Sequence, residues 1–349
     1  MANLSSEYFH NEEKAYAHLE SVVWPDGPTC PHCGECEKIG ALKPFAPRRK
    51  VKKNGEYVFD AKGEHVWKES PMRYGVKKCY SCRKQFTATV GTAFESSKIP
   101  LNKWLLATHL MTSSKKGISA HQIHRSLDIT YKTAWFMCHR IREAMVDDNP
   151  PPLGGKDKVI EADETYFGNK VSVKKNRQTK HYFTDPKTGE RKLYRTGGKR
   201  GPSNKYAVVS LVERGGSVRS FHVDRANKAN IREILVRNAD RKSKLMTDES
   251  HVYTKVGEEF ERHQHVIHSK KEYVRGDVYT NTLEGYYSIF KRGMIGTYQH
   301  CSEAHLQRYV TEFDFRYNGR KLNDNERRDA ALRGISGKRL TYRRINKAA

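Results

Sequence analysis

Three carboxylates interrupt an apolar, strand-like stretch, VIEADETYFG, at residues 159–168. A strand that enters a core usually lacks carboxylates, because burying an ionised one without a partner is very costly. The formal net charge of the chain is +25, so acids are the scarcer charge. At least one of Glu161, Asp163 and Glu164 therefore needs a partner, and a metal ion is the obvious candidate.

Two acids elsewhere in the chain could complete a metal site. LMTDES places Asp248 directly after a short apolar strand, and in TNTLEGYYSIFKRGM helical spacing puts Glu284, Ser288 and Lys291 on one face, away from an apolar stripe. Three acids from separate elements can hold two divalent ions about 3.5 to 4 Å apart, which activate a water and stabilise a leaving oxygen in phosphodiester cleavage. Lys291 would then face a DNA phosphate.

Two Cys-x-x-Cys pairs, in CPHCGEC and CYSCRKQF, indicate a second metal. Cys30 and Cys33 would form one knuckle and Cys79 and Cys82 the other, which together make a closed structural zinc site. The alternative is a set of scattered reduced cysteines. The gap between the pairs exceeds the usual spacing of roughly 15 to 20 residues. Cys36 forms an overlapping pair with Cys33, and we expect it to be a bystander.

Composition favours a soluble protein that binds a polyanion. The 65 Lys and Arg residues outnumber the 40 Asp and Glu residues, which indicates nucleic acid as the partner. A membrane surface is the rival, but the chain has no apolar run of 18 residues and its N-terminus does not resemble a signal peptide. Seven cysteines, an odd number, suit metal binding in a reducing compartment, so we expect a cytoplasmic protein.

The elements before residue 150 suggest DNA-binding modules. We expect a helix over 5–22, a hairpin inserted between the knuckles at 41–76, and a helix over 101–114. Two short helices should follow, with Ser119 and Thr130 as N-caps, separated by a tight turn at 128–129. This arrangement is typical of a helix-turn-helix whose last helix enters the major groove, where Lys132 and Arg140 would contact DNA.

The elements after residue 155 predict a mixed α/β sheet. We expect strands at 159–167, 206–213, 217–223, 244–246 and 265–268, and helices at 226–238, at 251–260 and after the last strand. Three antiparallel strands followed by alternating helices and strands is the order of a ribonuclease H-like fold. The interval 170–205 carries twelve Lys or Arg against two acids, and we expect a flexible or hairpin-like insertion along phosphates, or else a solvated loop.

A multidomain α/β protein follows from these elements. The expected segments are an N-terminal helix and zinc ribbon with an inserted hairpin (1–95), a helix-turn-helix-like segment (96–147), a linker (148–155), a ribonuclease H-like catalytic domain with the basic insertion (156–320), and a basic polar tail without a core (321–349).

The sequence resembles the zinc-ribbon DDE transposases of bacterial insertion sequences, in particular the group with a ribonuclease H-like catalytic domain. The phrases that carry the resemblance span about 24–318: WPDGPTCPHCG, CRKQFTATVGTAFESSKIPLNKW, ADETYFGNK, TDES, HSKKEYVRGDVYTNTLEGYYSIFKRGMIGTYQHCS and HLQRYVTEFDFRYN. It implies that Asp163, Asp248 and Glu284 bind the metal ions. Strand alternation alone leaves Glu161 and Asp163 equivalent on one face, and the DET phrase of the family selects Asp163. The insertion between the knuckles is larger than is usual in the family.

The resemblance implies DNA transposition. Two Mg²⁺ ions, with Mn²⁺ as an alternative, would support nicking at the element ends and attack of the freed 3′-hydroxyl on target DNA. The partners would be terminal inverted repeats and target DNA, bound by a dimer or higher oligomer at the bacterial nucleoid.

The candidate DNA-binding residues are Lys132, Arg140, His268, Lys291 and Arg292. The acids expected to have ordinary surface or capping roles are Glu161, Glu164, Asp224, Glu249 and Asp277. The alternatives are a catalytically silent zinc-ribbon regulator and a metal-dependent, structure-specific nuclease.

Overall fold

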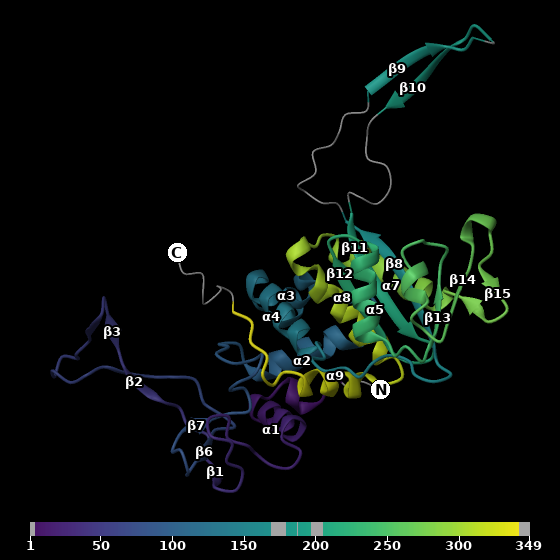
Figure 1. The fold of residues 1–349 in the computed structure, drawn as a ribbon. Helices are drawn as coiled ribbons and strands as arrows, with labels where there is room; N and C mark the ends of the chain where they lie inside the picture. The colour runs from purple at the N-terminus through teal and green to yellow at the C-terminus, as the bar shows by residue number, and fades with distance from the viewer. Residues whose placement is uncertain (1–3, 169–178, 187, 197–204, 342–349) are drawn as a thin grey trace. The chain divides into compact units, whose positions relative to one another are not determined.

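The structure is a computed structural model that describes residues 4–168, 179–186, 188–196 and 205–341 (Figure 1). The chain divides into two compact units, one made of residues 1–147 and 320–349, the other of residues 148–319. The predicted segments 1–95 and 96–147 thus fall in one unit, together with the C-terminal residues. In the part of the chain that the structure describes, no helix is both long and apolar enough to cross a membrane.

The first unit is built on helices. Its helical elements are η1 (Glu7–Phe9), α1 (Glu12–Val23), α2 (Leu101–Ser113), α3 (Ala120–Leu127), α4 (Tyr131–Ala144) and α9 (Asp324–Arg333). The helix predicted over 5–22 is interrupted, because Asn11 has extended backbone and its side chain accepts the N–H of Lys14 as the cap of α1. Ser119 and Thr130 cap α3 and α4 as predicted. Asp128 ends α3 in the left-handed conformation, with φ of 47°.

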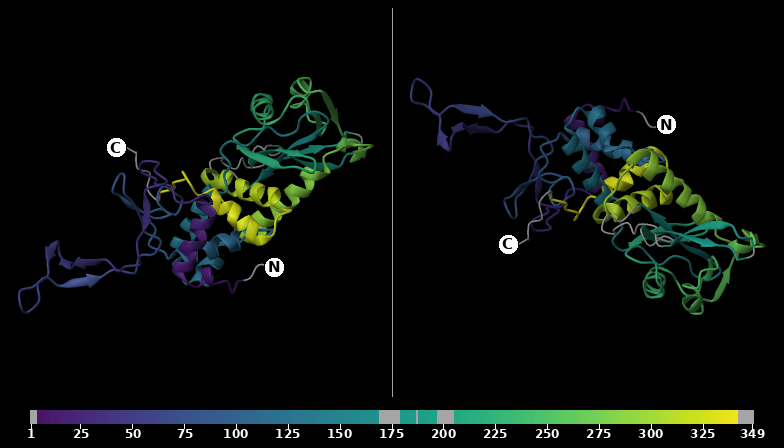
Figure 2. Two further views of the ribbon diagram at one scale, coloured as in Figure 1. Left: turned by 90° about the horizontal axis from the view of Figure 1, so that it is seen from below. Right: turned by 90° about the horizontal axis from the view of Figure 1, so that it is seen from above.

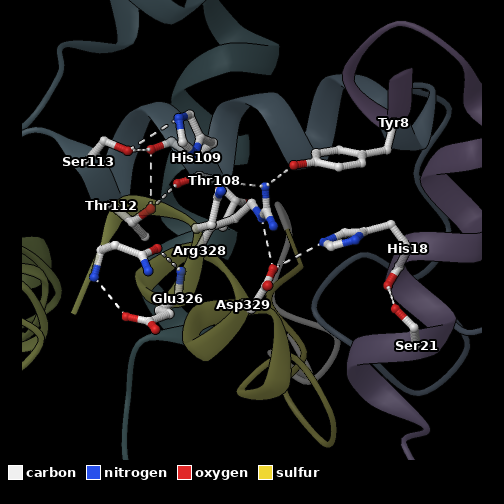
Figure 3. A network of polar contacts seen from close by, with 12 residues as sticks. Tyr8, His18, Ser21, Thr108, His109, Thr112, Ser113, Glu326, Arg328 and Asp329 are labelled. Carbon is white, nitrogen blue, oxygen red and sulfur yellow. Dashed lines mark hydrogen bonds and ion pairs between the residues drawn. The ribbon is translucent and has the colours of Figure 1, made fainter. Parts of the chain in front are cut away.

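The C-terminal segment corrects the prediction of a basic tail without a core. Helix α9 packs against α1, α2 and α4, and it buries Ala331 and Leu332 together with Arg328, which is 2% exposed. Arg328 Nη1 donates to the hydroxyl of Tyr8 at 2.8 Å and Nε donates to Asp329 (Figure 3). The prediction failed because a helix with a buried arginine and only a few apolar residues has no clear apolar stripe.

The zinc ribbon is a small antiparallel sheet. It consists of β1 (Ile39–Ala41), β6 (Lys77–Cys79) and β7 (Gln85–Phe86), in the order β1-β6-β7. Phe86 is buried in its core beside Cys30 and Cys79, and Trp24 packs against the cluster. The small core is typical of a ribbon whose stability depends on a metal.

The residues between the two knuckles form the predicted hairpin, here called the arm (residues 45–73). Strand β2 (Arg48–Lys50) pairs with β5 (Trp67–Glu69), and β3 (Lys52–Lys53) pairs with β4 (Glu56–Tyr57). Figures 1 and 2 show the arm as a thin run of strands without a helix on either face.

The second unit is built around a five-stranded mixed sheet in the order β12-β11-β8-β13-β14. Strands β11 (Tyr206–Glu213) and β12 (Val218–Val223) continue antiparallel from β8 (Val159–Phe167), while β13 (Lys244–Thr247) and β14 (Arg262–His265) run parallel to β8. This is the predicted ribonuclease H-like sheet. The last strand lies earlier than the predicted 265–268, because polar residues at 262–264 continue the ladder at the edge of the sheet.

Helices cover both faces of this sheet (Figure 2). Helix α7 (Asn281–Gly293), a π-helical turn (Met294–Tyr298) and α8 (Glu303–Asn318) pack on the face that carries Val208 and Val212. Helix α5 (Lys228–Asn238) and α6 (Thr254–Gly257) pack on the face that carries Val209 and Leu211. Helix α6 is a single turn within the longer helix predicted at 251–260.

The remaining short elements of this unit are one 3-10 turn and two hairpins. They are η3 (His268–Lys270), β15 (Val274–Arg275), β16 (Val278–Tyr279), β9 (Thr179–Thr184) and β10 (Arg191–Thr196). The last two pair as an antiparallel hairpin within the basic interval 170–205. The predicted flexibility of residues 169–178 and 197–204 lies outside the described residues.

Candidate active site and cysteine site

Asp163 and Asp248 lie side by side at the same edge of the sheet. Strands β8 and β13 are parallel, with Lys244 opposite Val159 and Met246 opposite Glu161. Continuing this register by two residues brings Asp248, which follows β13, level with Asp163. Residues at the same level of parallel neighbours point to the same face. Two carboxylates that are 85 positions apart in the chain therefore lie near each other, and the charge of Asp248 acts on Asp163.

Helix α7 brings a third acid to this edge. Glu284, Ser288 and Lys291 lie on one face of α7, as helical spacing predicted, and together with Asp163 and Glu164 they line an open hollow. The apolar stripe of the same helix, which includes Leu283 and Phe290, is buried against the sheet.

The acids at this edge make the site strongly electronegative. Burial and the charges of Asp248, Glu164 and Glu284 raise the pKa of Asp163 well above its ordinary value, opposed by the backbone N–H of Glu164. Burial, aided by Asp248, also raises the pKa of Glu164, although its Oε2 accepts a 2.7 Å hydrogen bond from Tyr253. Converging acids of this kind are stabilised by a divalent cation, whose preferred ligands are carboxylate oxygens. The residues present thus fit the Mg²⁺ expected from the sequence.

The cysteines and the carboxylates differ in how closely their potential metal-binding atoms lie. Among the described residues, the four cysteines are the group of potential ligands whose donor atoms all lie within 4.8 Å of one another. The three carboxylates at the sheet edge do not all lie that close together. A site for two ions does not require it, because ligands of different ions need not be neighbours.

The carboxylate of Glu161, which lies inside strand β8, has hydrogen-bond partners within the protein. Its side chain is fully buried, and Arg214 Nε donates to Oε1 at 2.7 Å. At the start of α7, the backbone N–H groups of Thr282 and Leu283 donate to Oε2 at 3.0 and 3.2 Å, and the hydroxyl of Thr282 donates to Oε1 at 2.9 Å. The first N–H groups of a helix have no partner within the helix and attract negative charge. Glu161 therefore caps α7, which confirms a capping role for this acid.

Contacts on both sides of Glu284 hold α7 against the sheet. Arg214 also donates to the carbonyls of Asp277 and Tyr279, each at 2.7 Å, and so fastens the hairpin that precedes the helix. Further along α7, the hydroxyl of Tyr287 donates to the carbonyl of Asp163 at 2.7 Å. The position of Glu284 relative to Asp163 thus follows from hydrogen bonds to the strand that carries Asp163.

His268 lies beside the candidate site. Its Nε2 is 3.7 Å from Glu284 Oε1, and its ring contacts Tyr273. Glu249 accepts hydrogen bonds from the N–H and hydroxyl of Ser269, which fastens the turn that holds His268. A histidine at this position can orient Glu284 or a substrate.

The other predicted DNA contacts differ in their surroundings. Lys132 is exposed in the first turn of α4, and Lys291 lines the hollow. Arg292 donates back to Ser288 on its own helix. Arg140 is 7% exposed, and its guanidinium donates to the carbonyls of Ala93 and Glu95. This burial contradicts the prediction that Arg140 contacts DNA.

The four predicted cysteines form a site with the dimensions of a zinc centre. The sulfurs of Cys30 and Cys82 are 3.7 Å apart, and those of Cys33 and Cys79 are 3.6 Å apart. Four sulfurs placed tetrahedrally at about 2.3 Å from zinc have edges of about 3.8 Å, whereas a disulfide bond is only about 2.05 Å long. Cys36 is exposed and lies outside this group, as expected.

Sequence reasoning missed three residues that shape the acid site. Arg214 follows β11 in an ordinary-looking turn, and no local pattern connects it with Glu161. Tyr287 belongs to the apolar stripe of α7, so its hydroxyl contact with Asp163 was hidden by its expected core role. Tyr253 is fully buried, and a buried tyrosine usually needs a hydrogen-bond partner, which is the signal that could have directed attention to Glu164.

Comparisons with known proteins agree with this architecture. Residues 152–318 match the ISXO2-like transposase domain, and residues 10–44 match the transposase zinc-ribbon domain. An uncharacterized protein in transposable element ISH50 of Halobacterium salinarum is 30% identical over 275 residues, which cover 76% of this chain and 86% of that protein.

Among solved structures, the chain is similar to the Drosophila P element transposase in a strand transfer complex. The identity is 11% and the TM-score 0.25, with 66% of this chain and 59% of that chain covered, so less than two thirds of that protein's length is matched. The family matches and the ISH50 relative show that the chain belongs to the ISXO2-like transposases, zinc-ribbon transposases of insertion sequences.

Proposed function

We propose that this transposase nicks DNA at the ends of its insertion sequence and joins the freed 3′-hydroxyl to target DNA, with Asp163, Asp248 and Glu284 holding two Mg²⁺ ions, for which Mn²⁺ could substitute. The observation that carries the proposal is the convergence of these acids at one sheet edge, with the pKa of Asp163 raised by burial and by its acidic neighbours. When bound, the two ions would stabilise the attacking and leaving oxygens of an in-line displacement.

Residues around the acids would bind and orient the substrate. Lys291 lines the same hollow as Glu284, so its ammonium can neutralise a phosphate of the strand to be cut. His268, 3.7 Å from Glu284, can hold that carboxylate in place. Burial keeps the pKa of Tyr287 well above its ordinary value, so its hydroxyl stays protonated and continues to donate to the carbonyl of Asp163.

The first unit would hold the DNA. A zinc ion bound by Cys30, Cys33, Cys79 and Cys82 would stabilise the ribbon, because its small core contributes little by itself. The exposed first turn of α4, which contains Lys132, is where a helix-turn-helix contacts base edges. The DNA partners would be the terminal inverted repeats and the target. Because two ends must be paired, we propose at least a dimer in the active complex.

The test is a labelled element end incubated with the protein and Mg²⁺, with binding and nicking followed in the same samples. Asp248→Asn should abolish nicking and joining while end binding persists, because it removes a ligand charge and leaves the DNA-binding unit intact. Glu284→Gln and Asp163→Asn should behave alike, since the three acids act as one unit.

The matched control is Asp224→Asn, which changes an acid whose side chain is 76% exposed and lies 4.0 Å from the guanidinium of its neighbour Arg225. It should nick like the parent. Undiminished nicking by Asp248→Asn would refute the catalytic assignment. A parent protein that binds its ends but never nicks them with any divalent metal would instead be a regulator.

A further inference from the structure

The arm carries an unusual exposed surface, here called the aromatic–lysine face. It consists of Lys50, Lys52, Tyr57, Phe59, His65 and Trp67. Each is paired across the strands with another member: Lys50 with Trp67, Lys52 with Tyr57, and Phe59 with His65. Residues directly opposite each other in an antiparallel pair point to the same face.

Ring contacts show that the six side chains form one continuous surface. The ammonium of Lys50 is 5.7 Å from the ring centres of both Tyr57 and Trp67, and that of Lys52 is 4.3 Å from Tyr57. The ring of His65 lies 4.5 Å from that of Phe59, nearly parallel to it, and 5.3 Å from that of Tyr57. The face therefore runs without interruption from Trp67 to Phe59.

The rings on this face are open to solvent. Tyr57, Phe59 and Trp67 are 48%, 55% and 49% exposed, although burial of large aromatic rings is a main source of stability in folded proteins. The interior of the arm is made instead by smaller residues, since Val51, Val58 and Val66 are half-buried and share backbone hydrogen bonds. The rings are thus not needed for the core of the arm, which leaves them available for a partner.

Charge identifies the class of partner. The arm contains eight Lys or Arg residues against four Asp or Glu residues, and none of the six residues of the face is acidic. A surface of aromatic rings interleaved with lysines fits a polyanion that also presents flat aromatic groups, which describes nucleic acid. A protein partner would need a matching acidic surface, whereas nucleic acid carries a negative charge on every phosphate.

The residue types further distinguish unpaired bases from duplex DNA. A duplex presents base edges and phosphates, and edges are read mainly by Arg, Asn and Gln, which are absent from this face. Unpaired bases present their flat surfaces, and these stack on exposed aromatic rings irrespective of sequence. We propose that the aromatic–lysine face binds unpaired DNA bases by stacking, with Lys50 and Lys52 contacting the adjoining phosphates.

This inference goes beyond the proposed function and does not depend on it, because stacking requires neither the acids nor Mg²⁺. The arm, residues 45–73, also lies outside both family matches, which cover 10–44 and 152–318. Single-strand binding could therefore fail while cleavage is intact, or persist in Asp248→Asn, and the two proposals can be separated.

The experiment measures binding of the full-length, zinc-loaded protein to a labelled oligothymidine, and to the same strand paired with oligoadenine, without Mg²⁺. Tyr57→Ala and Trp67→Ala should each weaken single-strand binding about fivefold or more, from the stacking energy of one base on one ring, and leave duplex binding unchanged. Tyr57→Phe and Trp67→Phe should retain affinity, because phenylalanine still stacks. Trp67→Phe should also remove part of the fluorescence quenching that single-strand binding causes.

Met72→Ala is the matched control, because Met72 is 45% exposed on the same arm but lies outside the face. Zinc content and thermal unfolding identify any variant that fails to fold, and the phenylalanine variants test stacking without changing the arm. Unchanged single-strand affinity in Tyr57→Ala with Trp67→Ala would overturn the proposal. An equal loss of duplex binding, or a dimer that these substitutions dissociate, would overturn it as well.

Discussion

Replacing Glu161 by glutamine tests whether this acid is a helix cap or a metal ligand. The fully buried carboxylate accepts four hydrogen bonds, from Arg214 Nε, the N–H and hydroxyl of Thr282, and the N–H of Leu283. Glutamine has the same shape but offers one oxygen. Its amide NH₂ must therefore face either the guanidinium or the two backbone N–H groups, all of which are donors.

The size of the effect follows from these contacts. An unmet hydrogen bond to a charged or helix-terminal group costs about 1.5–3 kcal/mol, so we expect Glu161→Gln to lower the free energy of unfolding by about 2–3 kcal/mol. Glu161→Ala leaves Arg214 without its buried partner and should cost about 3–5 kcal/mol. For a unit of this size, each kcal/mol lowers the melting temperature by about 2–4 °C, so Glu161→Gln should melt about 4–12 °C lower.

Thermal unfolding with and without Mg²⁺ separates the two roles of an acid. Glu161→Gln should melt lower without Mg²⁺ and still gain stability when Mg²⁺ is added, because the three proposed ligands remain. Asp248→Asn is the control, and it should show the opposite pair of results. It should melt no lower than the parent without Mg²⁺, since it removes a charge that disfavours ionised Asp163, and should lose the gain with Mg²⁺. If Glu161→Gln melts like the parent and loses the Mg²⁺ gain, the capping role is wrong.

Three further predictions address other parts of the chain. The purified protein should contain about one zinc, which Cys79→Ser with Cys82→Ser should remove together with part of the thermal stability, as measured by elemental analysis and melting. Lys291→Ala should reduce the slope of log affinity for DNA against log salt by about 0.9, whereas an unchanged slope would mean that Lys291 contacts no phosphate. Burial raises the pKa of Asp314 from 3.8 to about 6, so the folded state keeps a proton that the unfolded state has lost. Stability from this group is present below about pH 4 and is lost as pH rises through 6, by about 3 kcal/mol. Urea unfolding should show this loss in the parent, and Asp314→Asn should lack it.

Local pattern was sufficient for much of the fold. The strands β8 and β11 have the predicted bounds, because each is a run of buried and half-buried residues ended by turn residues. The caps Ser119 and Thr130 were recognisable because a capping side chain bonds to an N–H only three residues away. The cysteine group was equally visible, since thiolates in close pairs suit zinc whatever the intervening length. The family resemblance, confirmed by the comparisons, also came from contiguous phrases.

Long-range contacts decided what pattern left open or assigned wrongly. Arg140 was expected on the DNA and Arg328 in a polar tail, yet both are buried, because their hydrogen-bond partners come from segments such as Ala93 and Tyr8 that lie far away in the sequence. A charged side chain is compatible with a core only where acceptors and rings from other elements surround it. Composition and periodicity do not predict which residues those neighbours are.

Local pattern also could not distinguish the roles of the two acids on one face of β8. Glu161 and Asp163 are equivalent in strand alternation, and only the family phrase distinguished them. In the tertiary structure Glu161 meets Arg214 and the first N–H groups of α7, which neutralise its charge. Asp163, two residues further, lies near the acids Asp248 and Glu284, and burial together with their charges raises its pKa. Residue type and spacing made both positions candidates, and the packing of α7 against the sheet determined which carboxylate is a helix cap and which faces other carboxylates.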